Sequence, residues 1–163
     1  MSRLVWRIAS DTRLYEADDL TGAGAKTTGG RWNEPGDALV YSSQTRALAC
    51  LETVVHLRAV SLPLNRYLVE ITVPDAVWEQ AEIRSADDLP VGWEAQPAGR
   101  ASIQFGGEWI LERRSAILVV PSAIVPEEPN VLINPAHADS FGIVARKIRR
   151  WLYDPRLATA PKR

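Results

Sequence analysis

The residues best suited to chemistry lie in GGRWNEPGDALVY, residues 29–41, where a glycine pair precedes an arginine and a tryptophan and the segment ends in a tyrosine. Arg31 presents a planar, permanently charged fork that matches the oxygens of phosphate or ribose. The glycine pair, Gly29 and Gly30, lets backbone N–H groups approach a ligand without a collision with a Cβ atom. Tyr41 offers an aromatic face against which a flat group can stack. This combination predicts a site for a flat ligand that carries negative charge.

A carboxylate, Glu52, follows on the next expected element. It lies in ALACLETVVHL, residues 47–57, where Leu48 and Val55 mark the inward stripe of an amphipathic helix. A carboxylate beside such a stripe is expected to be paired or to face a cleft. A solvated glutamate at the boundary of the stripe is the structural alternative, as are a salt bridge in the turn for Arg31 and a core position for Tyr41. A loop, the end of the next strand and the following helix carry the three residues, so these are expected to converge.

The elements that must position these groups are mostly strands. Apolar and alternating runs predict strands, and SQTRALACLETVVHLRAV, residues 43–60, predicts the main helix with Ser42 or Ser43 as its N-cap. A shorter helix is expected over residues 107–115, with loops and at most a short helix over residues 76–106. Because strands outnumber helices without regular alternation, the chain is expected to adopt a mixed α+β fold. The predicted strands are residues 4–9, 38–41, 66–73, 115–125 and 130–135.

Composition excludes several classes of protein. The chain has 163 residues and a formal net charge of -1, which suits one domain with one substantial core and gives no basic field to attract nucleic acid. Cys50 is the only cysteine, so the chain forms no internal disulfide. The N-terminus is too charged for a signal peptide, and no apolar run approaches the ~20 residues of a membrane-spanning helix. We therefore expect a cytoplasmic protein with no membrane contact and no direct nucleic-acid binding.

Two patterns imitate known sites. GAGAKTTGG, residues 22–30, is similar to a phosphate-binding loop, but alanine stands where the Walker pattern requires the glycine before its lysine. The alternative interpretation of this segment is a glycine-rich loop that approaches a ligand. Glu52 and His56 share a helical face, yet a catalytic zinc site needs three protein ligands, and the one other histidine is His137. No metal site is expected.

The order of these motifs resembles the signature of the RES domain, a family named for its arginine, glutamate and serine. The resemblance rests on the GGRWN segment, the Tyr-Ser-Ser that follows it and the helical Glu52, all at matching spacing. It continues through VPSAIVPEEPNVLINPAH, residues 120–137, and YDPRL, residues 153–157, but is poor over residues 77–106. The resemblance implies a single RES domain over residues 1–163. It further implies an ADP-ribosyltransferase-like fold, with a strand-rich split sheet around NAD. The basic run over residues 142–157, which the residues alone leave open between helix and edge strand, then becomes a strand.

The resemblance also implies a function and a set of site residues. Members are toxins of bacterial type II toxin–antitoxin modules that cleave the nicotinamide–ribose bond of NAD and pass ADP-ribose to a protein, phosphate or water. The implied partner is an Xre-type helix-turn-helix antitoxin, and NAD is a substrate that needs no metal. A non-catalytic nucleotide- or partner-binding module is the alternative function. Among the serines, Ser122 matches the family position best, while Ser102 and Ser115 stay open. The implied catalytic residues are Glu52, Arg31 and Tyr41, and the implied NAD-binding residues are Gly30, Arg31, Trp32, Asn33, Tyr41, Ser122 and Asn134.

Overall fold

The computed structural model describes residues 1–57 and 62–158, and its centre is a seven-stranded sheet. The strand order is β4-β5-β6-β2-β1-β3-β7. All neighbouring strands are antiparallel except β4 and β5, which are parallel. The strands are β1 (Ser2–Ser10), β2 (Val40–Ser43), β3 (Arg66–Pro74), β4 (Glu82–Ile83), β5 (Ile117–Pro121), β6 (Pro129–Ile133) and β7 (Val144–Trp151).

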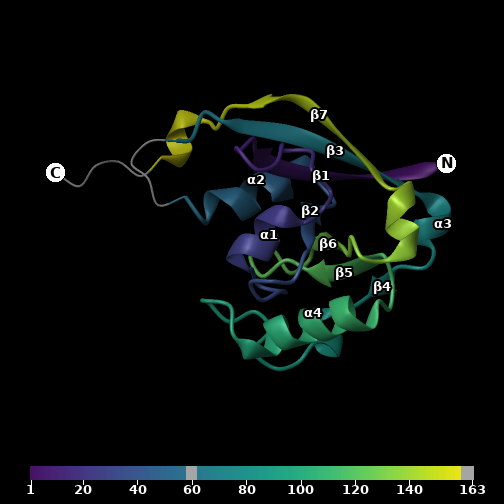
Figure 1. Cartoon of the computed structure of the whole chain (residues 1–163). Coiled ribbons are helices and arrows are strands. Elements are labelled where there is room, and N and C mark those ends of the chain that lie inside the picture. The colour runs from purple at the N-terminus through teal and green to yellow at the C-terminus, as the bar shows by residue number, and fades with distance from the viewer. Residues whose placement is uncertain (58–61, 159–163) are drawn as a thin grey trace.

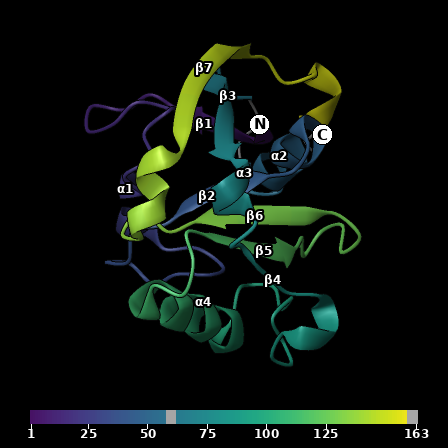
Figure 2. The same cartoon turned by 90° about the vertical axis from the view of Figure 1, so that its right-hand side faces the viewer.

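The sheet is split between β1 and β2. These two strands share a single register pair, Trp6 with Ser43, whereas β1 and β3 are paired along their whole length. As a result β1, β3 and β7 form one layer and β2, β6, β5 and β4 form another, as Figures 1 and 2 show. One buried cluster draws on both layers, with Val5 and Ile71 from the first and Val40 and Ile133 from the second. The predicted strand-rich α+β fold with a split sheet is confirmed.

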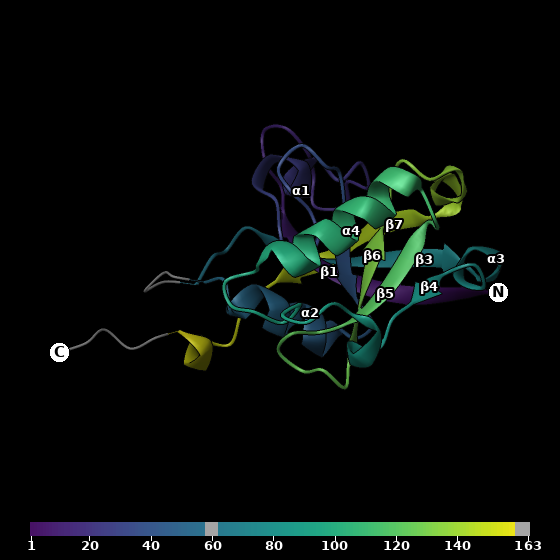
Figure 3. The ribbon, with the colours of Figure 1, turned by 90° about the horizontal axis from the view of Figure 1, so that it is seen from below.

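One helix packs on the strands of each layer. The helix α2 (Arg46–Val54) packs on β1, where Ala49 belongs to a buried cluster with Trp6 and Leu68. The helix α4 (Arg100–Glu112) lies across the second layer, as Figure 3 shows from below, and its fully buried Trp109 packs with Leu118 of β5. Short helical turns complete the described chain: α1 (Ala23–Thr28), α3 (Asp75–Trp78), η1 (Ala86–Asp88), η2 (Ala138–Gly142) and η3 (Pro155–Leu157). Within residues 1–57 and 62–158, no helix is long and apolar enough to cross a membrane.

All five strands predicted from apolar patterning are present, and the basic C-terminal run forms β7. The predicted N-cap of α2, Ser42 or Ser43, was wrong. The N-cap is Thr45, whose hydroxyl accepts a hydrogen bond from the backbone N–H of Leu48 at 3.1 Å, while Ser42 and Ser43 belong to β2. The helix ends at Val54, short of the predicted residue 60, and residues 58–61 lie outside the described part of the chain.

The second helix begins at Arg100 instead of residue 107, so the loops predicted over residues 76–106 were wrong at their end. The same region allowed for a short helix, and it contains the helical turns α3 and η1 together with the unpredicted short strand β4. Gly106 and Gly107 lie in the interior of α4. Because glycine normally weakens helices, this pair indicated the start of a helix where the helix in fact continues. The glycine-rich segment at residues 22–30 forms the short helix α1 between Gly22 and Gly29, both at positive φ, and is therefore a capped helical turn.

Candidate active site

Three chain segments meet at one end of the strands of the second layer, and they position the polar residues there. Ser43 ends β2 and is paired in register with Asn130 near the start of β6. Ser122 directly follows β5, and its backbone N–H donates to the carbonyl of Glu128 at 2.9 Å, which extends the pairing of β5 with β6. The helix α2 starts just beyond β2, so the side chain of its residue Glu52 reaches the same strand ends.

Glu52 is held through one of its two carboxylate oxygens. The hydroxyl of Ser122 donates to Oε1 at 2.7 Å, and the side-chain amide of Asn130 donates to the same oxygen at 2.6 Å. Among the described residues, no hydrogen bond reaches Oε2. The side chain is half-buried, so the structure favours a paired carboxylate over a freely solvated one. One oxygen is anchored, and the other is free to interact with a ligand.

The direction of the Ser122 hydroxyl is set by the chain that follows it. The backbone N–H groups of Ile124 and Val125 donate to Ser122 Oγ at 3.0 and 3.2 Å. Because these two donors occupy the oxygen's lone pairs, its hydrogen points to Glu52. The other two candidate serines are used elsewhere: Ser102 donates to the carbonyl of Gly99 at 3.4 Å, and Ser115 donates to the carbonyl of Ile117 at 2.7 Å. Of the three, Ser122 is the serine that contacts Glu52.

Asn130 is the residue of this group that sequence reasoning missed. Its contact with Glu52 depends on the register of β6 against β2, and its amide is turned by a hydrogen bond from Ser43 Oγ to Asn130 Oδ1 at 2.7 Å. The sequence offers one weak signal, since a polar residue begins an otherwise apolar strand run. A polar residue at a strand end is common, so this signal alone does not identify a site.

Tyr41 lies on the same face of β2 as Ser43, because alternate residues of a strand share a face. Its hydroxyl donates to Asn33 Oδ1 at 2.7 Å and accepts from the backbone N–H of Trp32 at 2.9 Å. Burial raises the pKa of Tyr41, while the hydrogen bond from Trp32 and the charge of Arg31 oppose that rise only in part. The phenol is therefore neutral and held in place, and only its ring is left to contact a ligand.

Arg31 holds a distant segment of the chain. Its Nη1 donates to the carbonyls of Trp93 and Ala95 at 3.0 and 2.8 Å, and its Nη2 donates to Gln96 Oε1 at 2.9 Å. A salt bridge in its own turn, the alternative considered from the sequence, is not the contact that forms. Since a guanidinium has five N–H donors, Nε–H and one Nη2–H remain for a ligand. Arg31 is thus first an anchor for residues 93–96.

Arg31→Ala is expected to loosen residues 93–96 and to speed cleavage after the exposed Glu94 by a glutamate-specific protease. Three hydrogen bonds from a charged donor are lost, and losses of roughly 1.5–3 kcal/mol raise the population of an opened segment by ~10-fold or more. Arg31→Lys should fall between the wild type and Arg31→Ala, because an ammonium lacks the planar fork.

The cleavage rate after Glu94 is measured by mass spectrometry of timed digests. Arg13→Ala serves as the control, since Arg13 is exposed and makes no side-chain hydrogen bond among the described residues. Equal rates after Glu94 in the wild type and Arg31→Ala would show that Arg31 does not anchor the segment.

The glycine pair, Gly29 and Gly30, is required by close contacts within the protein. A Cβ on Gly30 would lie 2.5 Å from the Tyr41 hydroxyl. Gly29 has φ of 68°, and a Cβ there would lie 2.9 Å from Pro35 Cδ. Side chains at either position would displace Tyr41 or the turn. The two glycines thus make room for the Tyr41 hydroxyl and for the chain reversal, and their expected role in admitting a ligand stays a prediction.

Three predicted NAD-binding residues are committed to internal contacts. Trp32 is 2% exposed and stacks on Trp93, with ring centroids 6.2 Å apart. The Asn33 amide donates to three backbone carbonyls. Asn134 is fully buried and follows the C-terminal end of β6, whereas Asn130 lies near the N-terminal end of that strand. The amide of Asn134 donates to the carbonyl of Ile110 at 3.1 Å. Their side chains are used up by packing and by backbone hydrogen bonds, so the structure speaks against direct ligand contacts for all three.

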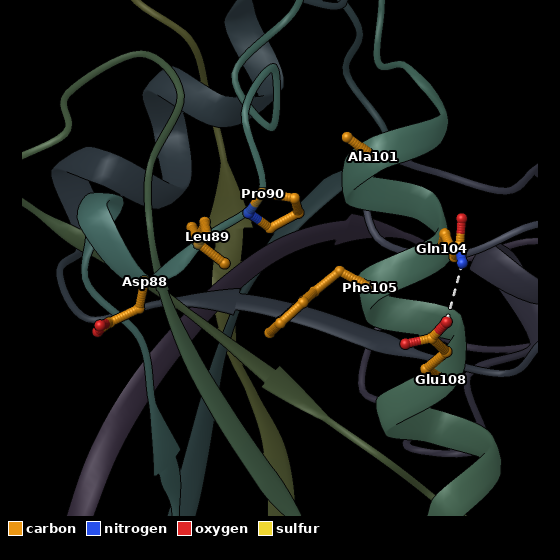
Figure 4. Close-up of a pocket in the computed structure, with 7 residues that line it drawn as sticks. All are labelled: Asp88, Leu89, Pro90, Ala101, Gln104, Phe105 and Glu108. Atoms are coloured by element: carbon orange, nitrogen blue, oxygen red, sulfur yellow. Dashed lines mark hydrogen bonds between the residues drawn. The ribbon is translucent and has the colours of Figure 1, made fainter.

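A separate hollow lies between η1 and α4 and contains none of the predicted site residues. Figure 4 shows Phe105 pointing into it from α4, opposite Leu89 and Pro90, with the carboxylates of Asp88 and Glu108 at its rim. Asp88 accepts hydrogen bonds from Ser85, and Glu108 accepts one from Gln104. The polar group around Glu52 thus stands apart from this hollow.

Comparison with known proteins identifies the family of this chain. The chain superimposes on a chain from the crystal structure of the Mycobacterium tuberculosis MbcT–MbcA toxin–antitoxin complex with a TM-score of 0.60, covering 90% of this chain and 82% of that one, at 17% sequence identity. At this identity the likeness concerns the fold alone. The RES domain matches residues 4–155, and the chain belongs to the RES domain family.

Curated relatives agree with this assignment. A protein of Sphingobium sp. (strain YBL2), named Prs ADP-ribosylating toxin, is 66% identical over 96% of this chain and 98% of its own length. Two proteins named Toxin Res, from Yersinia enterocolitica and Pseudomonas putida, are 37% and 34% identical. These matches cover 89% and 82% of this chain, and 94% and 86% of the relatives. The resemblance to RES-domain toxins seen in the sequence is confirmed.

Proposed function

We propose that this chain is the toxin of a toxin–antitoxin module and that it cleaves the nicotinamide–ribose bond of NAD, transferring ADP-ribose to a protein. The relative named as an ADP-ribosylating toxin supports the NAD-consuming activity, at 66% identity over almost the full length of both chains. The observation that carries the proposal is the state of Glu52, with Oε1 anchored by Ser122 and Asn130 and Oε2 free of protein hydrogen bonds among the described residues.

The reaction needs such a carboxylate. When the bond between nicotinamide nitrogen and ribose C1′ breaks, the electron pair leaves with the neutral base and positive charge moves onto the sugar. A fixed anion near the ribose interacts more strongly with this transition state than with the ground state. The acceptor then forms a bond to C1′ and loses its proton. Glu52 supplies the anion, and the two donors on Oε1 hold its position without neutralising its charge.

Other residues contribute binding. The remaining N–H groups of Arg31 are suited to the pyrophosphate of NAD, and the ring of Tyr41 is suited to contact a flat cationic base. Both lie near one another, since the Tyr41 hydroxyl accepts a hydrogen bond from the backbone N–H of Trp32, the residue next to Arg31. This assignment keeps Arg31 and Tyr41 in the site, while Trp32 and Asn33 hold the Tyr41 hydroxyl in place.

The acceptor decides the class of enzyme. The name of the Sphingobium relative favours a protein acceptor over phosphate or water. The test is to incubate the purified chain with NAD in the presence and absence of phosphate and of bacterial extract, and to analyse all products by mass spectrometry. Nicotinamide release with an ADP-ribose mass added to a protein supports transfer. Free ADP-ribose indicates hydrolysis, and ADP-ribose-1″-phosphate indicates phosphorolysis. If no nicotinamide is released under any condition, the non-catalytic binding module replaces this proposal.

The proposal extends to a partner and a place of action. The fold's likeness to a chain of a toxin–antitoxin complex supports an antitoxin partner, which we propose to be of the Xre helix-turn-helix type. A toxin that consumes NAD would act in the cytoplasm, where an antitoxin can restrain it. Co-expression with the protein encoded next to it should restore growth that the chain alone arrests.

A further inference from the structure

Asn130 and Ser43 form a hydrogen-bonded chain that ends on Glu52, and we propose that this pair is a positioning relay for the carboxylate. Ser43 Oγ donates to Asn130 Oδ1 at 2.7 Å, and Asn130 Nδ2 donates to Glu52 Oε1 at 2.6 Å. The inference rests on the proposed function, because it concerns the presentation of Glu52 to NAD. Neither residue touches substrate in this assignment; both act through Glu52.

The relay has a fixed direction. A side-chain amide offers an oxygen that accepts on one side and a nitrogen that donates on the other, and the two ends are nearly equal in shape. Ser43 is 3% exposed, so its hydroxyl requires an internal acceptor, and the amide oxygen of Asn130 provides it. With its oxygen turned to Ser43, Asn130 must present its N–H group to Glu52. The serine thereby selects the amide orientation that attracts a carboxylate.

The relay is built into the sheet and not into a loop. Ser43 and Asn130 are register partners on β2 and β6, and Tyr41 and Leu132 continue the same pairing. The next residue, Gln44, extends the ladder with a hydrogen bond from its backbone N–H to the carbonyl of Pro129 at 3.3 Å. A site held by strands is located more precisely than one held by loops. The relay therefore ties the position of Glu52 to the register of the two strands.

The relay also selects which carboxylate oxygen faces the ligand. Asn130 and Ser122 both donate to Oε1, from the start of β6 and from the turn after β5. Two donors on one oxygen disfavour rotation of the carboxylate, and Oε2 has no hydrogen bond among the described residues. Loss of Asn130 leaves one donor and a carboxylate that can turn. The cost should appear in the rate of the chemical step more than in NAD binding.

The decisive test compares Asn130→Asp with Asn130→Ala in the full chain, with nicotinamide release as the assay. Aspartate keeps the size of asparagine and can still accept from Ser43, but it places an anion against Glu52. If Asn130 only fills space, the aspartate variant is the milder of the two. The relay predicts the reverse order. We expect kcat to fall by ~10-fold for alanine and by ~10²-fold or more for aspartate, with KM for NAD changed by less than about threefold.

Two adjacent serines supply a matched control. Ser42 and Ser43 are both buried, each donates a 2.7 Å hydrogen bond to β6, and they face opposite sides of β2. Ser43→Ala should lower kcat by about 3- to 10-fold, because Asn130 loses the bond that orients it. Ser42→Ala removes a bond to the carbonyl of Val131 on the other face and should leave kcat within about twofold. Melting temperatures measured for all variants report general damage to the sheet.

The outcomes separate this inference from the proposed function. Glu52→Gln is measured in parallel, and full turnover by that variant would overturn the proposed function itself. If Glu52→Gln is inactive but Asn130→Asp is as active as Asn130→Ala, the relay is wrong and the function stands. Equal kcat values for Ser43→Ala and Ser42→Ala would likewise overturn the relay. Should an Asn130 variant fail to fold, the serine pair decides alone.

Discussion

Replacement of Glu52 by glutamine is expected to lower the rate of NAD cleavage by at least ~10²-fold, about 3 kcal/mol of lost transition-state stabilisation. The amide has nearly the shape of the carboxylate, and its oxygen can still accept the hydrogen bonds from Ser122 and Asn130. What disappears is the negative charge that faces the sugar as it becomes cationic. Initial rates of nicotinamide release measure the effect, and growth arrest on expression should disappear with it.

Glu127→Gln is the matched control for this variant. Glu127 lies in the connection between β5 and β6, is exposed, and makes no side-chain hydrogen bond among the described residues. It should retain wild-type turnover. A Glu52→Gln protein that still releases nicotinamide at more than about a tenth of the wild-type rate would remove Glu52 from the catalytic role that we assign to it.

Gly106→Ala is expected to cause the largest loss of stability of any single methyl addition considered for this chain. A Cβ at this position would overlap the backbone carbonyl oxygen of Trp32, with the Trp32 carbonyl carbon 2.7 Å away. Backbone atoms cannot move aside as a flexible side chain can, so α4 would have to shift from the sheet and break the contacts of its buried Trp109. We expect a loss of at least ~3 kcal/mol in the free energy of unfolding, at the upper end of overpacking effects.

The neighbouring Gly107→Ala makes the comparison specific. Gly107 occupies the same helix, and the nearest atom to its Cβ position is Asp37 Oδ2 at 4.0 Å. Alanine is a better helix former than glycine, so this variant should gain up to ~1 kcal/mol. Urea denaturation followed by circular dichroism measures both changes. If both glycines respond alike, the close approach of α4 to Trp32 is not a constraint on the fold.

Much of the secondary structure follows from local pattern. The alternation of Tyr67, Val69, Ile71 and Val73 predicts a strand, and β3 places the last three of these residues in the core between the layers. Local pattern failed where a residue type has two uses. The serines before α2 are good caps in general, but here they serve β2, and the glycine pair in α4 looks like a helix start. In both cases tertiary contacts override the propensity of the residues.

The site divides in the same way. Residue types and their order indicate Glu52, Arg31, Tyr41 and Ser122 and, through the family signature, an NAD-consuming toxin. The partners of these residues lie far along the chain: Ser122 is 70 residues from Glu52, Asn130 is 78, and Arg31 contacts residues 62 to 65 positions away. No local pattern encodes such pairings, because the register of β2 against β6 and the path of residues 89–98 decide them.

From the sequence alone, then, come the strand-rich fold class, the family and the candidate carboxylate Glu52, since these depend on residue type, periodicity and motif spacing. The tertiary structure alone decides that Asn130 donates to Glu52, that Ser122 and not Ser102 or Ser115 reaches Glu52, and that the side chains of Trp32, Asn33 and Asn134 make internal contacts. The physical reason is that a hydrogen bond depends on the position and direction of both partners. Those are properties of packed strands and helices, which a single chain segment does not contain.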